Sequence, residues 1–558
     1  MFRYSQHREL MPSANQFNRS LIVFGGLLLL SCLSTRSGAE PIDADYLLVD
    51  GTIMDGSGEA SHVGSVAIRG DRIVAVGEFE VGTVGKTISC EGMIIAPGFI
   101  DLHNHSDSSI EIKDERTGEE KNSRPIFADA TQHAECYLTQ GCTTLVTGNC
   151  GGGALPVGEF YDSLSEVAPG INVAHLLPQG ALREQVIGLT RRAPTDEELQ
   201  EMKKLASQAM QEGAWGMTTG LQYVPSSFAD SDELAAIASV VGQHGGFYAS
   251  HIRDEGDLLL ESIEEALEIG RSGNLPVHIS HLKSSKRPNW GKVHAAAALV
   301  ERARSAGMHV TADQYPYEAS STSITAMLLP DVEREGGTEA LLQRLNDTEQ
   351  LPRLQKLIEE SIAARGAIMI ARCPKHPTWV GKMIREVAKE ENREPVDVAL
   401  DILRSGEEQG VSFSMSPEDV RYVMTLPWVA TASDGGVKVD DGTRPHPRSF
   451  GTFPRKIGLF AIEEKVISPE TAIRSASGLP ADILNLPERG YLKPNYFADV
   501  VVFDPQTFRD HATYQAPFEM SSGVRWLFVN GKTAINEGSL GDTNAGRPLR
   551  KKAPAEAQ

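Results

Sequence analysis

Short apolar runs alternate with amphipathic helical stretches through the middle of the chain. Helical periodicity is clearest in residues 197–211, 258–271 and 293–306. Strands that alternate with helices predict parallel βαβ units, and eight such strands predict a closed (β/α)8 barrel. The eight candidate buried strands lie at 98–102, 143–147, 171–177, 216–221, 246–250, 276–280, 308–313 and 428–433.

Two blocks near the ends of the chain contain short apolar runs with the periodicity of β-strands. In both, apolar residues alternate or cluster between turns, which is typical of short antiparallel strands. We therefore expect a barrel at 98–484, strand-rich segments at 40–97 and 485–545, and a mobile tail at 546–558. The candidate strands of the two blocks are 46–49, 65–69, 72–76, 499–503 and 524–529.

The connection between the seventh and eighth candidate strands is too long for an ordinary crossover. It runs from Tyr315 to Leu426, whereas connections inside compact domains are usually only a few residues long. We expect an inserted subdomain at about 318–426 that lies over the strand ends.

The first forty residues have the features of an export signal. Three arginines precede an apolar run at 21–30, and small residues at 37–39 offer a cleavage site. The run is too short to span a bilayer, which takes about 20 apolar residues. The sequence before Cys32 also resembles a bacterial lipobox, so a lipid anchor at Cys32 and simple cleavage of residues 1–39 both stay open. In either case we expect an exported protein, periplasmic or extracellular, without a membrane span.

Composition and charge narrow the classes of partner. With 41% apolar and 23% charged residues, the chain has a globular composition, which excludes wholesale disorder and a polytopic membrane protein. The formal net charge of −22 argues against nucleic acid, because binding to phosphates needs clustered Lys and Arg. A small anionic substrate held by a few local cations is compatible with this charge. Six cysteines are too few for a disulfide scaffold in 558 residues.

Candidate metal ligands follow the predicted barrel strands. His103 and His105 end the first strand, and alternate residues of a strand share one face, so both imidazoles can reach one ion. Cys150 follows the second strand beside three glycines, where a thiolate would be a soft, tight ligand for zinc. His251 and His281 each follow a further short apolar run.

Each of these residues alone has an ordinary structural explanation. An isolated Cys is usually a small buried hydrophobe, and Asp434 before Gly435 is typical of a turn. Their coincidence changes the interpretation, because the histidines, Cys150 and Asp434 fall at the ends of five different predicted strands. Barrel enzymes gather their active sites on that carboxyl-terminal face. One metal site with a carboxylate beside it is therefore favoured over five separate structural explanations.

Taken together, the motifs resemble the amidohydrolase superfamily, and within it the N-acyl-D-amino-acid deacylases, also called D-aminoacylases. The resemblance covers roughly residues 44–532. Gly-Asn-Cys-Gly at 148–151 together with His-Pro-Arg at 446–448 is specific to this branch, which uses a cysteine where many amidohydrolases use a carboxylated lysine. The matching segments are 98–105, 148–151, 250–255, 280–283, 313–317, 433–435 and 446–455.

The resemblance implies a fold and a metal centre. The fold is an α/β protein with a (β/α)8 TIM-like barrel and a small β-sandwich built from both chain ends. The centre would hold a tight zinc on Cys150, His251 and His281. A second and often weaker position would be formed by His103, His105, Cys150 and Asp434.

The resemblance also implies the reaction, which is hydrolysis of the amide bond of N-acyl-D-amino acids by a metal-activated water. Asp434 would act first as general base and then as general acid, giving a carboxylate and a free D-amino acid. Lys283, Tyr315 and Arg448 would bind the α-carboxylate of this small-molecule substrate. Tyr223 matches the family more loosely and is expected to line the side-chain pocket.

Two other functions stay open. A cyclic-amide hydrolase similar to D-hydantoinases or dihydroorotases would use the same water activation, but those relatives have a bridging lysine where this chain has Cys150. The second is a non-catalytic exported protein that keeps the barrel as a binding scaffold. The complete set of candidate ligands argues against it, since a decayed site would be expected to have lost some of them.

Overall fold

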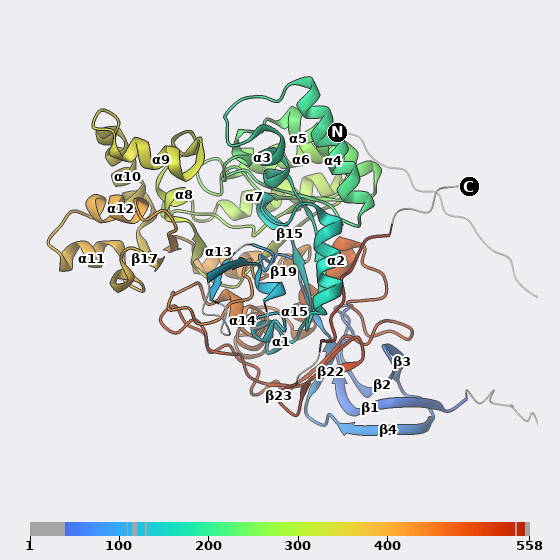
Figure 1. Ribbon diagram of the computed structural model, residues 1–558. Helices are drawn as coiled ribbons and strands as arrows, with labels where there is room; N and C mark the ends of the chain where they lie inside the picture. Colours follow the sequence, from blue (N-terminus) through green and yellow to red (C-terminus); the bar gives the residue numbers. More distant parts are fainter. Residues whose placement is uncertain (1–39, 109, 114–119, 129–130, 542–543, 553–558) are drawn as a thin grey trace, which may run out of the picture. The chain divides into compact units, whose positions relative to one another are not determined.

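The computed structural model describes residues 40–108, 110–113, 120–128, 131–541 and 544–552 (Figure 1). The predicted export signal and Cys32 lie in residues 1–39, outside this part of the chain. Within the described ranges, no helix is both long enough and apolar enough to cross a membrane.

Parallel strands form a closed barrel, which confirms the predicted fold class. In barrel order they are β6 (Phe99–Asp101), β9 (Cys142–Thr147), β10 (Asn172–His175) with β11 (Leu177–Pro178), β12 (Met217–Gly220), β13 (Tyr248–His251), β14 (Val277–Ile279), β15 (Val310–Gln314) and β19 (Val429–Thr431). Each predicted run overlaps a strand, and the run at 171–177 overlaps both β10 and β11. The ring closes where the amide of Asp434 donates to the carbonyl of His103 over 2.9 Å, and that of His105 to Gly435 over 2.7 Å.

Helices fill the connections between the barrel strands. The three predicted ones are α4 (Asp196–Gln211), α6 (Leu259–Gly273) and α7 (Lys292–Ser305). The α4 helix begins after a capping box, in which the Thr195 hydroxyl and the Glu198 carboxylate each accept the other residue's backbone amide. Further elements are β7 (Ile110–Lys113), β8 (Glu120–Ser123), η1 (Pro125–Phe127), α1 (Glu135–Leu138), η2 (Asn149–Gly151), α2 (Val157–Val167), α3 (Gln179–Ile187), η3 (Ser226–Phe228), α5 (Ser231–Gln243), η4 (Arg287–Asn289), α14 (Arg448–Pro454), the π-helix η7 (Arg455–Glu463), α15 (Pro469–Ala476) and α16 (Gly478–Leu484).

Strands from both ends of the chain form one nine-stranded sheet. Its members are β1 (Ile42–Ile53), β2 (His62–Arg69), β3 (Arg72–Gly77), β4 (Val81–Ser89), β5 (Ile94–Pro97), β20 (Val500–Phe503), β21 (Val524–Val529), β22 (Lys532–Asn536) and β23 (Ser539–Leu540). The antiparallel pairing of β20 with β5 joins the two ends. The sheet also folds back on itself, because Lys86 of β4 lies 4.3 Å from the ring centre of Trp526 in β21. A sandwich built from both chain ends is therefore confirmed.

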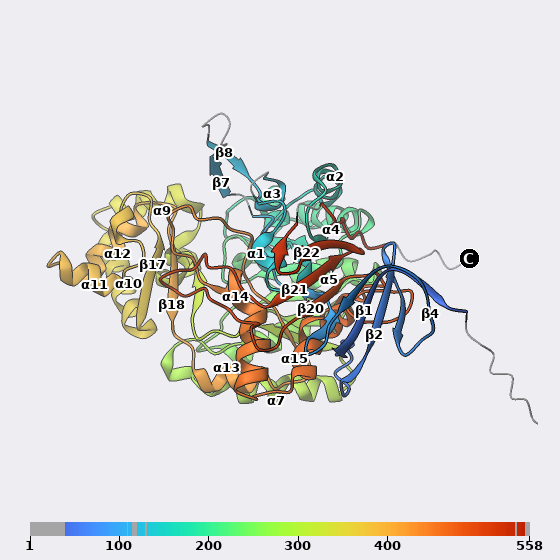
Figure 2. The same cartoon turned by 90° about the horizontal axis from the view of Figure 1, so that it is seen from below.

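The long connection after β15 folds as a subdomain with an apolar core of its own, and most of its helices lie to one side of the barrel (Figures 1 and 2). We call residues 318–426 the insertion. Its three strands form an antiparallel sheet in the order β16-β18-β17. The elements are β16 (Ser320–Thr322), α8 (Ile324–Leu328), η5 (Asp331–Arg334), α9 (Gly337–Asn346), α10 (Leu351–Arg365), β17 (Ala367–Arg372), η6 (Pro377–Trp379), α11 (Ile384–Glu390), α12 (Pro395–Leu403), β18 (Gln409–Phe413) and α13 (Pro417–Val423).

The expectation of a mobile tail was wrong for residues 546–552. The amide of Val173 in β10 donates to the carbonyl of Arg547 over 3.0 Å, and the amide of Leu549 donates back to Val173 over 2.7 Å. The indole of Trp215 donates to the carbonyl of Leu549 over 2.6 Å. This segment is held because its backbone pairs with the outer edge of a barrel strand, a partner that a short polar stretch does not reveal in sequence.

Candidate metal centre and substrate cavity

Backbone turns after the barrel strands aim the candidate ligands into the barrel mouth. Cys150 has φ 53°, His281 φ 37° and Asp434 φ 50°, all in the left-handed region that non-glycine residues rarely adopt. The side chain of Asn149 stabilises the first of these turns by donating to the carbonyl of Val146 over 2.9 Å. Such conformations cost about 1–3 kcal/mol each and cluster at functional sites. The rest of the fold therefore holds three predicted site residues in unfavourable backbone geometry.

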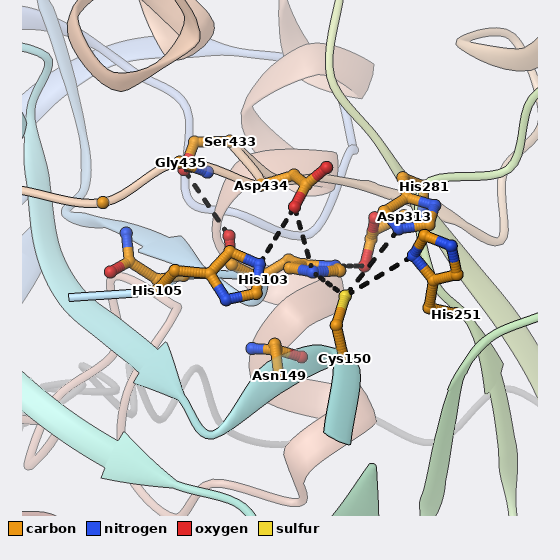
Figure 3. Close-up of polar contacts among 12 residues, drawn as sticks. His103, His105, Asn149, Cys150, His251, His281, Asp313, Ser433, Asp434 and Gly435 are labelled. Atoms are coloured by element: carbon orange, nitrogen blue, oxygen red, sulfur yellow. Dashed lines mark hydrogen bonds and ion pairs between the residues drawn. The ribbon is translucent and has the colours of Figure 1, made fainter. Parts of the chain in front are cut away.

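The Cys150 sulfur lies at the centre of the candidate ligands (Figure 3). Its Sγ is 3.2 Å from Nε2 of His103, 3.7 Å from Nδ1 of His251 and 3.9 Å from Nε2 of His281. A tetrahedral zinc, with bonds of about 2.3 Å to sulfur and about 2.0 Å to nitrogen, separates such atoms by roughly 3.5 Å. The two longer separations therefore fit ligands of one shared ion.

Asp434 lies on the opposite side of this group, beside both histidines of the first strand. Its Oδ1 is 3.1 Å from Nε2 of His105 and 3.3 Å from Nε2 of His103. Ligand atoms of His103, Cys150, His281 and Asp434 all lie within 4.8 Å of one another. The structure thus brings together every residue that the sequence analysis named as a candidate metal ligand.

Electrostatics favour the anionic forms of Cys150 and Asp434. Burial acts to raise the pKa of the Cys150 thiol, but the facing charge of His103 and hydrogen bonds from the surrounding imidazoles hold that pKa well below its ordinary value. Burial also acts to raise the pKa of Asp434. The charges of Arg448 and His103 have the larger opposite effect, so this pKa lies well below its ordinary value. Burial lowers the pKa of His251, which keeps that imidazole neutral as ligation requires. A thiolate, a carboxylate and imidazoles suit a borderline-soft divalent ion such as zinc.

Two carboxylates that the sequence analysis did not assign orient the ligand rings. Asp313 Oδ2 is 3.2 Å from Nδ1 of His103, and Glu255 Oε1 is 2.9 Å from Nδ1 of His281. Each contact occupies one ring nitrogen and leaves Nε2 for an ion. The signal for both was present, because Asp313 and Glu255 lie in the segments 313–317 and 250–255 that carry the family resemblance. His251 differs, since its Nε2 is buried without a hydrogen-bond partner in the described chain.

The three residues predicted to bind a substrate carboxylate line the same cavity, whose volume is about 320 Å³. Nη1 of Arg448 donates to Oδ2 of Asp434 over 2.7 Å, and the guanidinium lies 4.9 Å from the ring centre of Tyr315. The ammonium of Lys283 forms an ion pair with Glu255. Lys283 and Arg448 are thus buried ion-pair members rather than solvated surface charges.

Tyr223 takes a more central position than its loose motif match suggested. Its ring centre is 4.8 Å from that of His251, and its hydroxyl accepts a hydrogen bond from Thr322 of β16 over 3.1 Å. The phenol keeps its own proton for another acceptor, since burial raises its pKa further above the ordinary range. It is therefore a hydrogen-bond donor beside a candidate ligand, in addition to a pocket wall.

Comparison with known proteins identifies relatives of this chain. The chain matches the amidohydrolase family over residues 86–535. It is 31% identical to a D-aminoacylase of Alcaligenes xylosoxydans xylosoxydans in an alignment of 542 residues that covers 93% of this chain and 100% of that protein. An N-acyl-D-aspartate deacylase of the same organism is 31% identical over 543 residues, covering 93% and 96%.

A solved structure supports the same relationship. The N-acyl-D-glutamate deacylase of Bordetella bronchiseptica, complexed with zinc and a phosphonate that mimics the tetrahedral intermediate, superposes with a TM-score of 0.77 at 29% identity. The match covers 91% of this chain and 100% of that one. The family resemblance read from the sequence motifs is confirmed.

Proposed function

The chain belongs to the amidohydrolase family, and from this premise we propose that it hydrolyses N-acyl-D-amino acids to a carboxylate and a free D-amino acid. One observation carries the proposal: a buried thiolate, imidazoles and Asp434 converge in a cavity that also contains Arg448 and Lys283. The first group suits a metal, and the second suits a substrate carboxylate. Relatives named for deacylation of D-amino acids support the same substrate class.

We propose zinc as the metal, held tightly by Cys150, His251 and His281. Their spacing supports this position, and His103 with His105 supports a second, weaker one that shares Cys150 and Asp434. Bound zinc supplies a water of lowered pKa and a polarised amide carbonyl at neutral pH.

Asp434 is proposed to accept the proton of the attacking water and to return it to the leaving nitrogen. Its Oδ2 is fixed by Arg448, while Oδ1 faces the candidate ligands His105 and His103. The low pKa of the carboxylate keeps it unprotonated and able to accept a proton. The hydroxyl of Tyr223 is placed to donate its free proton to the substrate carbonyl oxygen.

The substrate α-carboxylate is proposed to bind among Arg448, Lys283 and Tyr315. A guanidinium has five donors, and Arg448 uses one on Asp434 and another on the carbonyl of Ser321 at 3.3 Å. The remaining donors can bind an incoming carboxylate without breaking the Asp434 contact. Lys283, which lines the same cavity, would add a second positive charge.

A hydrolysis screen tests this function. N-acetyl-D- and N-acetyl-L-amino acids, a D-hydantoin and dihydroorotate are incubated with enzyme, with chelated enzyme and with chelated enzyme given zinc again. We expect hydrolysis of N-acetyl-D-amino acids that chelation removes and zinc restores. Cleavage of the cyclic amides alone would favour the hydantoinase-like alternative, and no turnover of any compound would favour a binding scaffold.

We further propose that the protein is exported. The arginines before the apolar run at 21–30 and the small residues at 37–39 support a signal peptide over 1–39. Mass spectrometry of the mature amino terminus tests this proposal. A chain beginning at Glu40 indicates simple cleavage, a lipidated Cys32 indicates an anchored lipoprotein, and an intact Met1 contradicts export.

A further inference from the structure

Apart from Cys150, which is assigned to the metal, the substrate cavity carries more positive than negative side chains, although the whole chain has a formal charge of −22. Two carboxylates line it, Glu255 and Asp434, and each is paired with one cation, Lys283 and Arg448 respectively. Two further cations line the same cavity, and neither forms an ion pair within the described chain. They are Arg365 and Lys438. The α-carboxylate of a substrate accounts for one excess positive charge at most.

Arg365 is the better placed of these two cations for a specific ligand. It is the last residue of α10 in the insertion, and its Nε donates to the carbonyl of Met327 over 2.7 Å. That bond fixes the plane of the guanidinium, whereas no described group bonds to its Nη1 and Nη2. Burial lowers the pKa of Arg365, so an anionic partner would stabilise its charged form. A planar, anchored fork matches a carboxylate better than the flexible ammonium of Lys438 does.

The surroundings of Arg365 leave room for an added group on the substrate. Arg365 also lines a neighbouring cavity of about 470 Å³, and Gln222, Glu255, Ser285 and Ala326 belong to both. Glu255 and Asp254 are the carboxylates that interact most strongly with the charge of Arg365, and both already bind other groups. Glu255 pairs with Lys283, and Asp254 accepts the backbone amides of Gly256 and Leu258.

We propose that Arg365 binds a second carboxylate of the substrate, so that the preferred substrates are N-acyl amino acids with two negative charges. This inference rests on the proposed function, because it takes the α-carboxylate to be bound by Arg448, Lys283 and Tyr315. The second carboxylate comes either from an acidic amino-acid side chain or from a dicarboxylic acyl group. Both present the same chemistry to the guanidinium.

Matched substrate pairs test the assignment and separate the two sources. The pairs are N-acetyl-D-glutamate with N-acetyl-D-glutamine, N-acetyl-D-aspartate with N-acetyl-D-asparagine, and N-succinyl-D-alanine with N-acetyl-D-alanine. We expect the wild-type enzyme to prefer the dianion in at least one pair by about 10- to 100-fold in kcat/KM, the range of charge-assisted hydrogen bonds. The pair that shows the preference identifies the source of the carboxylate.

Variants locate the effect. Arg365→Met should lower kcat/KM for the preferred dianion by about 10- to 100-fold and for its neutral partner by less than about threefold. Arg372→Met is the matched control, because Arg372 lies in the insertion, pairs with Glu407 and does not line the substrate cavity. It should leave both values unchanged. The unfolding temperature and zinc content of each variant show whether the fold is retained.

Four outcomes would overturn the inference. An equal loss on both members of a pair in Arg365→Met would make the residue structural, and a larger loss of preference in Lys438→Met would place the second carboxylate at Lys438. Hydrolysis of neutral substrates by the wild type without preference for any dianion would refute the inference and leave the proposed function intact. Failure to hydrolyse all six compounds would refute the proposed function, and the inference with it.

Discussion

The barrel and the insertion contribute different kinds of residue to one cavity. The barrel supplies every candidate ligand and Asp434, whereas the insertion supplies neutral polar groups and one cation, Thr322, Gln409 and Arg365. Barrel residues are fixed by strand ends, while those of the insertion stand on a subdomain with its own core. On the proposals above, the reaction depends on the barrel, whereas a preference for a second carboxylate depends on a separately packed part of the chain. Changes in the insertion should therefore leave zinc binding by the barrel residues intact.

The largest expected effect is in the barrel. Asp434→Asn keeps the shape of the side chain but cannot accept a proton, so kcat should fall roughly 10²- to 10⁴-fold for every substrate. Metal analysis should show unchanged zinc, because the tight position does not use Asp434. Hydrolysis near the wild-type rate would remove Asp434 from the role of acid and base.

Cys150→Ala should weaken zinc binding by more than about 100-fold, since even residues that only orient a ligand contribute 10- to 100-fold. The measurement is zinc stoichiometry after dialysis against a weak chelator. Cys142→Ala is the control, because Cys142 is a buried free thiol of β9 away from the cavity. Full zinc content in Cys150→Ala would exclude the residue as a ligand.

Arg448→Ala separates substrate binding from chemistry. We expect KM to rise about 10- to 100-fold for N-acetyl-D-alanine but little for N-acetyl-D-alanine amide, which lacks the α-carboxylate. The fall in kcat should be common to both compounds, because Arg448 also holds Asp434. Equal changes in KM would show that Arg448 does not bind the carboxylate.

A smaller effect is expected at the boundary between the two regions. Thr322→Val removes the hydroxyl that donates to Tyr223, and kcat should fall by about three- to tenfold with zinc content and KM unchanged. Tyr223→Phe should cost more, and the double variant should cost no more than Tyr223→Phe alone. Additive losses would show that Thr322 acts independently of Tyr223.

The smallest expected effect concerns stability. Lys456 in η7 is fully buried, its ammonium has no partner in the described chain, and burial lowers its pKa from 10.5 to about 7. Between these values the unfolded chain binds more protons, so stability should increase as pH rises from about 7 to about 10. Lys456→Met should remove this dependence and raise the unfolding temperature by a few degrees at neutral pH. Differential scanning calorimetry at several pH values is the measurement, and an unchanged slope in the variant would contradict the assignment.

Much of the fold could be predicted from local pattern. Every predicted barrel strand is observed, since a short apolar run bounded by turns is sufficient to mark a buried strand. The convergence of the candidate ligands could also be predicted, because the parallel strands of a barrel all end on one face. Motifs quoted for the family already contained Asp313 and Glu255, yet no role was assigned to either.

What could not be predicted depends on partners distant in the sequence. Asp313 contacts His103 across 210 residues, and Arg365 lines the cavity only because the fold of the insertion brings the end of α10 to it. The left-handed backbone of Cys150 has no sequence signal, since the residue is not glycine. Docking of residues 546–552 depends on backbone groups of Val173 in β10 that pair with Arg547 and Leu549, and no local pattern marks this partner.

The hydrogen bonds that close the barrel are made by the backbone of candidate site residues and of Gly435. The amides and carbonyls of His103, His105, Asp434 and Gly435 join the first strand to the last. A nascent chain consequently cannot assemble its proposed active centre until residue 435 has been synthesised, more than 300 residues after the first candidate ligand. The proposed active centre therefore forms only when the barrel has closed, and synthesis of any one ligand is not sufficient.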